Sequence, residues 1–283
     1  MNVLVTGAGG QLGYDILKEL YSRNIKFLGV DKQDFDITDY DAVQKCIKTY
    51  MPDVVIHCSA YTAVEKAEDE PEICRKVNVY GTENIAKVCK EINAKLLYIS
   101  TDYVFSGIGT QYYKPEDEQK PKNVYGQTKL DGERVVKKLL DKYFIVRTSW
   151  VFGINGNNFV KTMLQLGKNR KEIDVVADQI GSPTYTVDLA ILLCNMIETE
   201  KYGIYHATNE GVCSWAEFAE SIFEIAGLDI KVNYVTTKQY PTKAKRPKNS
   251  RLSKEKLIEN GFDKLPSWKD AGKRYIESVI KNI

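Results

Sequence analysis

Apolar runs and amphipathic segments alternate along the first half of the chain. Short apolar stretches rich in β-branched residues predict buried strands near residues 2–6, 26–30, 53–58, 95–100 and 143–148. Between them, apolar residues recur at helical spacing near residues 11–22, 39–49, 71–92 and 124–142. This alternation is typical of a parallel sheet with helices on both faces. We therefore predict an α/β fold with a Rossmann-like, doubly wound parallel sheet.

The pattern becomes less regular after about residue 150. We expect a helix that residues 155–159 open and that ends at Gly167, helices at 186–198 and 215–226, and an ordered loop at 178–184. The chain is thus expected to divide into a sheet domain, residues 1–150, and a smaller C-terminal lobe, residues 151–283, which mainly binds the substrate. Some segments of the second part can return to the first.

Composition narrows the class of protein. The 283 residues are 43% apolar with a net charge of +2, which gives no general affinity for polyanions. The first residues form a strand without a positively charged region, and no apolar run approaches the roughly 20 residues that span a bilayer. No two of the six cysteines form a Cys-x-x-Cys pair, and there are only two histidines. We expect a cytoplasmic protein with reduced thiols and no metal site.

A glycine-rich turn follows the first strand at once. Gly7, Gly10 and Gly13 lie between that strand and a helix, where glycine permits a tight turn and close approach of the backbone to a pyrophosphate. The helix N-terminus adds unpaired N–H groups and a favourable dipole. The second strand ends at Asp31, where a partner of a ribose 2′-hydroxyl is expected. The order of these features predicts a dinucleotide site in residues 1–150.

Tyr125 and Lys129 are four residues apart on a predicted helix, so their side chains share one face. An ammonium near a phenol favours the phenolate, so we expect Lys129 to lower the pKa of Tyr125. Thr101 directly follows the predicted strand at 95–100. Its hydroxyl could hydrogen-bond the oxygen that Tyr125 protonates. A solvated helix face is the alternative interpretation of the Tyr-x-x-x-Lys spacing.

Other polar and aromatic residues follow the predicted strands, and the carboxyl ends of parallel strands meet in one crevice. They are the segments 59–62, 101–102 and 148–150. A basic segment from Lys238 to Lys256 holds eight Lys or Arg residues and one acidic residue. It is either a solvated loop or a clamp for a diphosphate through Arg246 and Arg251. Nucleic acid is a poorer partner, because the rest of the chain is not basic.

The chain resembles the extended short-chain dehydrogenase/reductase family over nearly its whole length. Within that family it is most similar to the reductases of dTDP-linked 4-keto-6-deoxy sugars. The motifs that carry the resemblance are Gly7-x-x-Gly10-x-x-Gly13, Ala60-Tyr61-Thr62-Ala63-Val64, Ser100-Thr101-Asp102-Tyr103-Val104-Phe105, Asn123-Val124-Tyr125-Gly126-x-Thr128-Lys129, Arg147-Thr148-Ser149-Trp150-Val151, Gly156-Asn157-Asn158-Phe159, Asp178-Gln179-x-Gly181-x-Pro183-Thr184 and Arg246-Pro247-x-Asn249-Ser250-x-Leu252.

The resemblance implies reduction of the C4 ketone of dTDP-4-dehydro-6-deoxy-L-mannose to dTDP-L-rhamnose with NADH or NADPH. Tyr125, Lys129 and Thr101 would be catalytic, and a homodimer is possible. The implied cofactor-binding residues are Gly7, Gly10, Gln11, Leu12, Gly13, Asp31, Asp36, Ile37, Ala60, Tyr61, Thr62, Tyr125 and Lys129. The implied substrate-binding residues are Val64, Thr101, Asp102, Trp150 and Arg246. Lys32 leaves the choice between NADH and NADPH open, because a lysine could meet a 2′-phosphate.

Two other functions remain open from the sequence. One is another sugar-nucleotide reductase or epimerase of the same superfamily, and the other is a non-catalytic NAD(P)-binding regulatory subunit. Related 4,6-dehydratases have Asp-Glu after the threonine, whereas Tyr103 follows Asp102 in this chain. The missing glutamate favours simple reduction over elimination of water.

Overall fold

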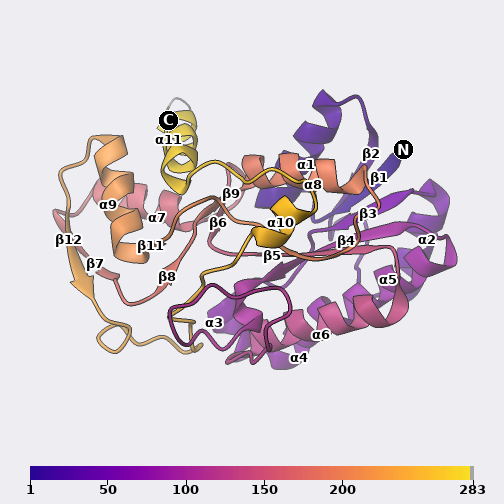
Figure 1. Cartoon of the computed structure of the whole chain (residues 1–283), viewed down its shortest axis with the longest axis horizontal. Coiled ribbons are helices and arrows are strands. Elements are labelled where there is room, and N and C mark those ends of the chain that lie inside the picture. Colours follow the sequence, from indigo (N-terminus) through magenta and orange to yellow (C-terminus); the bar gives the residue numbers. More distant parts are fainter. Residues whose placement is uncertain (281–283) are drawn as a thin grey trace.

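A six-stranded parallel sheet forms the centre of the molecule in the computed structural model, which describes residues 1–280 (Figure 1). The strand order is β10-β5-β4-β3-β1-β2. The strands are β1 (Asn2–Thr6), β2 (Lys26–Val30), β3 (Val54–His57), β4 (Lys95–Thr101), β5 (Tyr143–Thr148) and β10 (Gly203–His206). The order reverses between β1 and β3, and such a switch point places a crevice at the carboxyl ends of the strands.

Helices cover both faces of this sheet. Alternate residues of a strand point to opposite faces, so Val3 and Val5 of β1 join one core while Leu4 joins the other. The first core is shared with α1 (Gln11–Ser22) and α8 (Thr186–Ile197). The second core lies under α2 (Tyr40–Tyr50), α5 (Thr82–Glu91) and α6 (Val124–Leu139). Both faces of the strands are therefore buried, as their continuous apolar runs predict.

The predicted helix at 71–92 is interrupted. It consists of α4 (Pro71–Arg75), a π-helical turn η1 (Lys76–Gly81) and α5. A π-helical turn holds one more residue per turn than an α-helix and is often found at functional sites. The other predicted helices of the first half end within three residues of their predicted limits.

A second lobe is built from the rest of the chain around its own aromatic core, which includes Phe152, Phe218 and Tyr275. In Figure 1 it lies at the left, with helices α7, α9 and α11 beside a short pair of parallel strands, β7 and β12. Its elements are β6 (Val151–Phe152), α7 (Phe159–Gly167), β7 (Glu172–Val176), β8 (Ile180–Gly181), β9 (Thr184–Tyr185), β11 (Cys213–Ser214), α9 (Trp215–Ala226), β12 (Lys231–Val235) and α11 (Trp268–Ile280). The short helix α10 (Glu255–Glu259) packs instead on β10 of the central sheet. Two short helices, α3 (Val64–Ala67) and η2 (Asp102–Val104), follow β3 and β4.

The chain returns to the sheet domain after its first passage through this lobe. Helix α8 packs along α1, and β10 pairs with β5 at the edge of the central sheet. The segment 186–206 thus belongs to the sheet by its contacts, although it lies after residue 150 in the sequence. No helix within residues 1–280 is long and apolar enough to cross a membrane.

Candidate active site

A cleft of about 1030 Å³ opens at the carboxyl ends of the central strands. It runs from the glycine turn after β1 to helix α6, and the segments 150–151 and 156–157 of the second lobe also line it. Every residue expected to bind the cofactor lines this cleft, as do Thr101, Asp102, Val64 and Trp150. Arg246 and Arg251, the two candidate contacts to a diphosphate, are not among the lining residues.

The glycine turn leaves no room for side chains. Gly7 has φ +68°, and a Cβ there would lie 2.8 Å from the Ser59 backbone nitrogen. A Cβ on Gly13 would lie 2.1 Å from the Gly7 carbonyl oxygen, so α1 can approach β1 only with glycine at this position. The turn therefore has the close backbone packing that a pyrophosphate site requires.

Asp31 lies beside this turn. Its Oδ2 accepts a hydrogen bond of 2.5 Å from the Gly9 backbone N–H, which fixes the carboxylate at the cleft. Lys32 and Lys76 line the same end of the cleft. The carboxylate suits a ribose 2′-hydroxyl, and the two ammonium groups suit a 2′-phosphate.

The three predicted catalytic residues lie together in the cleft. Thr101 ends β4, while Tyr125 and Lys129 lie one turn apart on α6. Asn123 caps this helix, because its side chain accepts a 2.7 Å hydrogen bond from the Gly126 N–H. The cap fixes the start of α6 and hence the direction in which Tyr125 enters the cleft.

The prediction that Lys129 lowers the pKa of Tyr125 is wrong. Burial raises the pKa of Tyr125, and the nearby Asp102 carboxylate raises it further. Burial also lowers the pKa of Lys129 to about 7, against a partial opposing effect of Glu133. Lys129 is therefore only partly charged near neutral pH, and burial outweighs the ammonium that the spacing alone had suggested.

A buried ion pair lies one helical turn from Lys129, and it was not predicted from the sequence. Glu133, one turn after Lys129, binds Arg147 of β5 through two hydrogen bonds of 2.8 and 2.7 Å. Ser100 donates a 2.6 Å hydrogen bond to the same carboxylate. The only nearby sequence feature that indicated this contact is that Glu133 follows Lys129 by four residues, the same spacing that separates Tyr125 from Lys129.

Asp102 is held by two hydroxyls. Ser250 donates to Oδ2 at 2.5 Å and Thr101 donates to Oδ1 at 3.1 Å. Burial raises the pKa of Asp102 to about 6. This carboxyl group can therefore exchange a proton near neutral pH at the side of Thr101.

Trp150 forms part of the wall between the sheet and the lobe. Its backbone has φ +51°, a left-handed conformation that is rare for a bulky residue. Its ring stacks on Trp215 with the centroids 3.7 Å apart. A Cβ on Gly181 would lie 2.8 Å from the Trp150 ring, so the ring is confined on that side as well.

Four of the eight basic residues in the segment from Lys238 to Lys256 form ion pairs with acidic residues from elsewhere in the chain. Arg246 donates to Glu65 at 2.7 and 3.0 Å, and it lies close enough to Tyr103 of the cleft wall to influence its pKa. Arg251 donates to Asn249. Three lysines of the segment also form ion pairs, which are Lys243–Asp69, Lys248–Asp178 and Lys254–Glu210.

Further polar side chains hold the cleft together. Gln11 was expected to contact the cofactor, but its Oε1 also accepts hydrogen bonds of 2.9 Å from Gly153 and Asn158, which ties the glycine turn to the second lobe. His57 is buried, and its two ring nitrogens form hydrogen bonds with Thr6 and Thr82. Over residues 1–280, no group of three or more His, Cys, Asp or Glu side chains could hold a metal ion.

Comparison with known proteins gives consistent matches over the whole chain. The family model described as RmlD substrate binding domain matches residues 1–280. The dTDP-4-dehydrorhamnose reductase of Aggregatibacter actinomycetemcomitans is 45% identical, over 95% of this chain and 96% of the relative. The spore coat polysaccharide biosynthesis protein SpsK of Bacillus subtilis is 40% identical, over 97% and 96%. The crystal structure of dTDP-4-dehydrorhamnose reductase from Bacillus anthracis in complex with NADP matches with a TM-score of 0.96 and 45% identity, over 98% of this chain and 99% of that chain.

Proposed function

The chain belongs to the RmlD substrate-binding family, and we propose that Thr101, Tyr125 and Lys129 carry its reaction in the cleft. It is an NAD(P)H-dependent oxidoreductase that reduces the C4 ketone of dTDP-4-dehydro-6-deoxy-L-mannose to dTDP-L-rhamnose. The observation that carries the proposed residue roles is the meeting of these three side chains in a cleft that also contains the glycine turn.

The residues present fit a nicotinamide dinucleotide. Gly7 and Gly13 provide the close-packed turn for the pyrophosphate, and Asp31 is fixed for the ribose near it. The same cleft continues to Tyr125 and Lys129. When bound, the reduced nicotinamide supplies the hydride that adds to the C4 carbonyl carbon.

Tyr125 donates the proton that completes the reduction. As the ketone becomes an alkoxide, its oxygen gains negative charge and the phenol transfers its proton to that oxygen. The Thr101 hydroxyl lies beside Tyr125 and donates to Asp102 in the structure, and in this proposal it turns to donate to the same oxygen. The raised pKa of the phenol keeps Tyr125 protonated until the stronger base has formed. Lys129 holds the nicotinamide ribose and, when protonated, stabilises the phenolate that remains.

The substrate lies on the lobe side of these groups in this proposal. Asp102 accepts from a sugar hydroxyl, while Val64 and the exposed face of Trp150 pack against the apolar parts of the ligand. Arg246 forms an ion pair with Glu65 and, in this proposal, its guanidinium also contacts the diphosphate of the substrate.

The test is the oxidation of NADH and NADPH by the purified protein, followed spectrophotometrically, with 4-keto sugar nucleotides that carry dTDP, UDP or GDP. We expect turnover with the dTDP-linked 4-keto-6-deoxy sugar and little with the others. Isomerised sugar without net oxidation of the cofactor would indicate an epimerase instead. Cofactor binding without conversion of any sugar would indicate a regulatory subunit.

Location and assembly belong to the same proposal. All six cysteines are free thiols in the structure, which supports a reducing compartment such as the cytoplasm. A homodimer stays a prediction, and light scattering of the purified protein tests it.

A further inference from the structure

The Lys129 ammonium lies against the face of an aromatic ring. Its Nζ is 3.9 Å from the centroid of the ring of Tyr98, a fully buried residue of β4. We propose that Tyr98 is a positioning residue for the reaction, whose ring holds the Lys129 ammonium at the cleft. The role in turnover rests on the proposed function, whereas the contact between the ring and the ammonium does not.

The contact has the features of a strong cation–π interaction. A ring face attracts an ammonium within about 6 Å of its centroid, and the attraction grows where water is excluded. Lys129 is 3% exposed, and its side chain has no hydrogen bond or ion pair with another side chain of residues 1–280. The carboxylate of Glu133, one turn along α6, is already bound by Arg147 and Ser100. The Tyr98 ring is therefore the group that holds the ammonium by direct contact.

Tyr98 also contacts the backbone of α6. Its hydroxyl donates at 3.4 Å to the carbonyl oxygen of Lys129. Gly132 permits this approach, because a Cβ at that position would collide with the Tyr98 hydroxyl. The His57 ring packs on the Tyr98 ring with the centroids 5.7 Å apart. The ring is thus fixed against both the backbone and the ammonium of Lys129.

The other titratable groups around Lys129 are neutral when its ammonium titrates. Burial lowers the pKa of His57 to about 3 and raises the pKa of Cys58, which directly follows β3, to about 12. Burial also raises the pKa values of Cys74 on α4 and Tyr125 on α6. A change of ionisation near pH 7 at this point of the cleft therefore belongs to Lys129.

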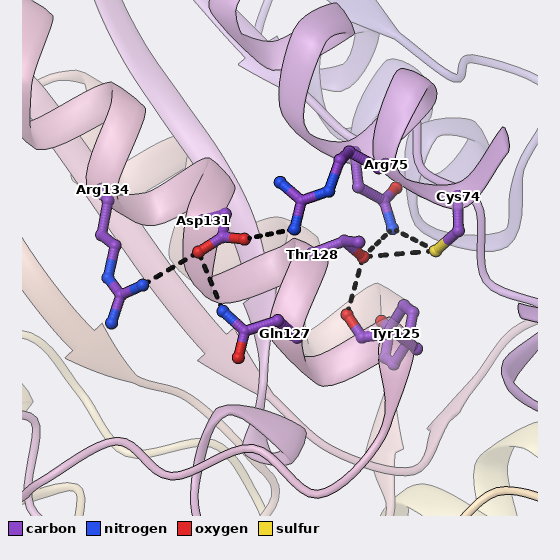
Figure 2. Close-up of polar contacts among 8 residues, drawn as sticks. Cys74, Arg75, Tyr125, Gln127, Thr128, Asp131 and Arg134 are labelled. Carbon is purple, nitrogen blue, oxygen red and sulfur yellow. Dashed lines mark hydrogen bonds and ion pairs between the residues drawn. The ribbon is translucent and has the colours of Figure 1, made fainter. Parts of the chain in front are cut away.

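Helix α6 has supports that do not involve Tyr98. The carboxylate of Asp131 accepts hydrogen bonds from three side chains, which are those of Arg75, Gln127 and Arg134 (Figure 2). Arg75 belongs to α4, so this contact ties the two helices together. Loss of the Tyr98 ring should therefore change the surroundings of the ammonium and leave α6 in place.

The first test is an NMR titration of the protein labelled at lysine Cε, with the Lys129 signal assigned by its loss in Lys129→Met. In the wild type we expect the signal to be shifted upfield by the ring current of Tyr98 and to titrate with a pKa of about 7. Tyr98→Leu should abolish the upfield shift and lower the pKa by about one unit, because the ring no longer stabilises the ammonium. Tyr98→Phe keeps the ring and should keep both values.

Phe144→Leu is the matched control. It removes a fully buried ring from the core on the other face of the same sheet. It should lower the melting temperature, as Tyr98→Leu does, and leave the pKa of Lys129 unchanged. An unchanged pKa in folded Tyr98→Leu would overturn the proposal. A wild-type Lys129 signal without an upfield shift would overturn it too, and this measurement decides the matter should Tyr98→Leu not fold.

The pH dependence of turnover tests the role in the reaction. Protonated Lys129 stabilises the phenolate, so kcat/KM for the dTDP-sugar at saturating NADPH should fall as the pH rises through the pKa of Lys129. Tyr98→Leu should move this fall to lower pH by about one unit, and Tyr98→Phe should restore it. Burial raises the pKa of Asp102 to about 6, and any effect of its titration should occur at the same pH in all three proteins.

The two measurements separate this inference from the proposed function. If the wild-type protein reduces none of the 4-keto sugar nucleotides, the proposed function fails, while the NMR titration still supports or rejects the contact between Tyr98 and Lys129. If the protein turns over the dTDP-sugar and Tyr98→Leu lowers the pKa of Lys129 without moving the pH profile, the contact exists but the role of Tyr98 in the reaction is overturned.

Discussion

Tyr125 is the residue whose chemistry can be isolated most cleanly. Its hydroxyl is the only proton donor that the proposed mechanism assigns to the alkoxide, while its ring and backbone can be kept by phenylalanine. Tyr125→Phe should lower kcat roughly 10²–10⁴-fold and leave the NADPH dissociation constant nearly unchanged. Steady-state kinetics and a fluorescence titration measure the two quantities. A kcat within a few-fold of the wild-type value would contradict the assigned role.

The burial of Lys129 makes the free energy of unfolding depend on pH. Burial lowers its pKa to about 7 from the usual 10.5, so between these values the unfolded chain holds a proton that the folded chain has released. Wild-type stability attributable to Lys129 therefore rises with pH through this window, and the full cost of burying the ammonium applies below pH 7. Lys129→Met should increase the free energy of unfolding by roughly 1–3 kcal/mol near pH 6.5, with a smaller gain near pH 9.5.

Urea unfolding at the two pH values measures this difference for Lys129→Met. The exposed Lys137 on the same helix supplies the control, and Lys137→Met should give the same small change at both. A gain from Lys129→Met that is equal at the two pH values would contradict the buried ammonium.

Asp31 sets the expected cofactor preference. A carboxylate accepts from a 2′-hydroxyl and repels a 2′-phosphate, whereas Lys32 beside it attracts the phosphate, so use of both NADH and NADPH is expected. Asp31→Ala should raise the ratio of kcat/KM for NADPH to that for NADH about tenfold. Asp34→Asn, on the same turn but outside the cleft lining, should leave the ratio within about twofold. An unchanged ratio in Asp31→Ala would remove this residue from the cofactor site.

Two glycines inside helices are expected to respond in opposite directions. A Cβ on Gly132 of α6 would lie 2.4 Å from the Tyr98 hydroxyl and 2.8 Å from the Asn78 carbonyl, so Gly132→Ala should cost about 1–3 kcal/mol of stability. A Cβ on Gly272 of α11 would meet only the Phe218 ring at 3.9 Å, and Gly272→Ala should gain up to about 1 kcal/mol. Chemical denaturation of both variants checks the signs, and stabilisation by Gly132→Ala would show that α6 has room to move.

Elements with strong periodicity were predictable because local pattern and burial agree. Strands β1, β2 and β5 and helices α1 and α9 have the predicted limits. The π-helical turn η1 was not predicted, because one added residue hardly changes the apolar spacing of a segment as long as 71–92. Asn78 of that turn hydrogen-bonds Tyr61 and Thr128, which are distant from it in the sequence.

Residues that line the cleft were predictable where one sequence segment carries several features. The glycine turn and the spacing of Tyr125 and Lys129 placed their residues in one cleft. The ion pair of Glu133 with Arg147 joins a helix to a strand, and no local sequence pattern at either residue predicts the other as its partner. The pKa of Tyr125 was also beyond the sequence, because it depends on burial that only the folded chain creates.

At the scale of the whole molecule, Arg246 tests how the lobe side of the site contacts the substrate. Arg246→Ala should raise the KM for the dTDP-sugar about tenfold, with little effect on NADPH binding, because a guanidinium can grip a diphosphate through two hydrogen bonds. Glu65→Gln frees the guanidinium from its carboxylate partner and should leave that KM unchanged or lower it. The increase should shrink for an analogue without the diphosphate. Equal KM values in Arg246→Ala and wild type would show that Arg246 pairs with Glu65 and does not contact the substrate.

The late arrival of β10 has a consequence for how the protein is made. On the ribosome, β5 emerges well before Gly203–His206, so it waits as an open edge beside the nascent sheet, and α1 waits without α8. At roughly 5–20 residues per second, this exposure lasts several seconds for each new chain. Unpaired strand edges recruit other chains, so the interval between synthesis of β5 and β10 is the period in which newly made copies are most exposed to aggregation and to chaperone binding.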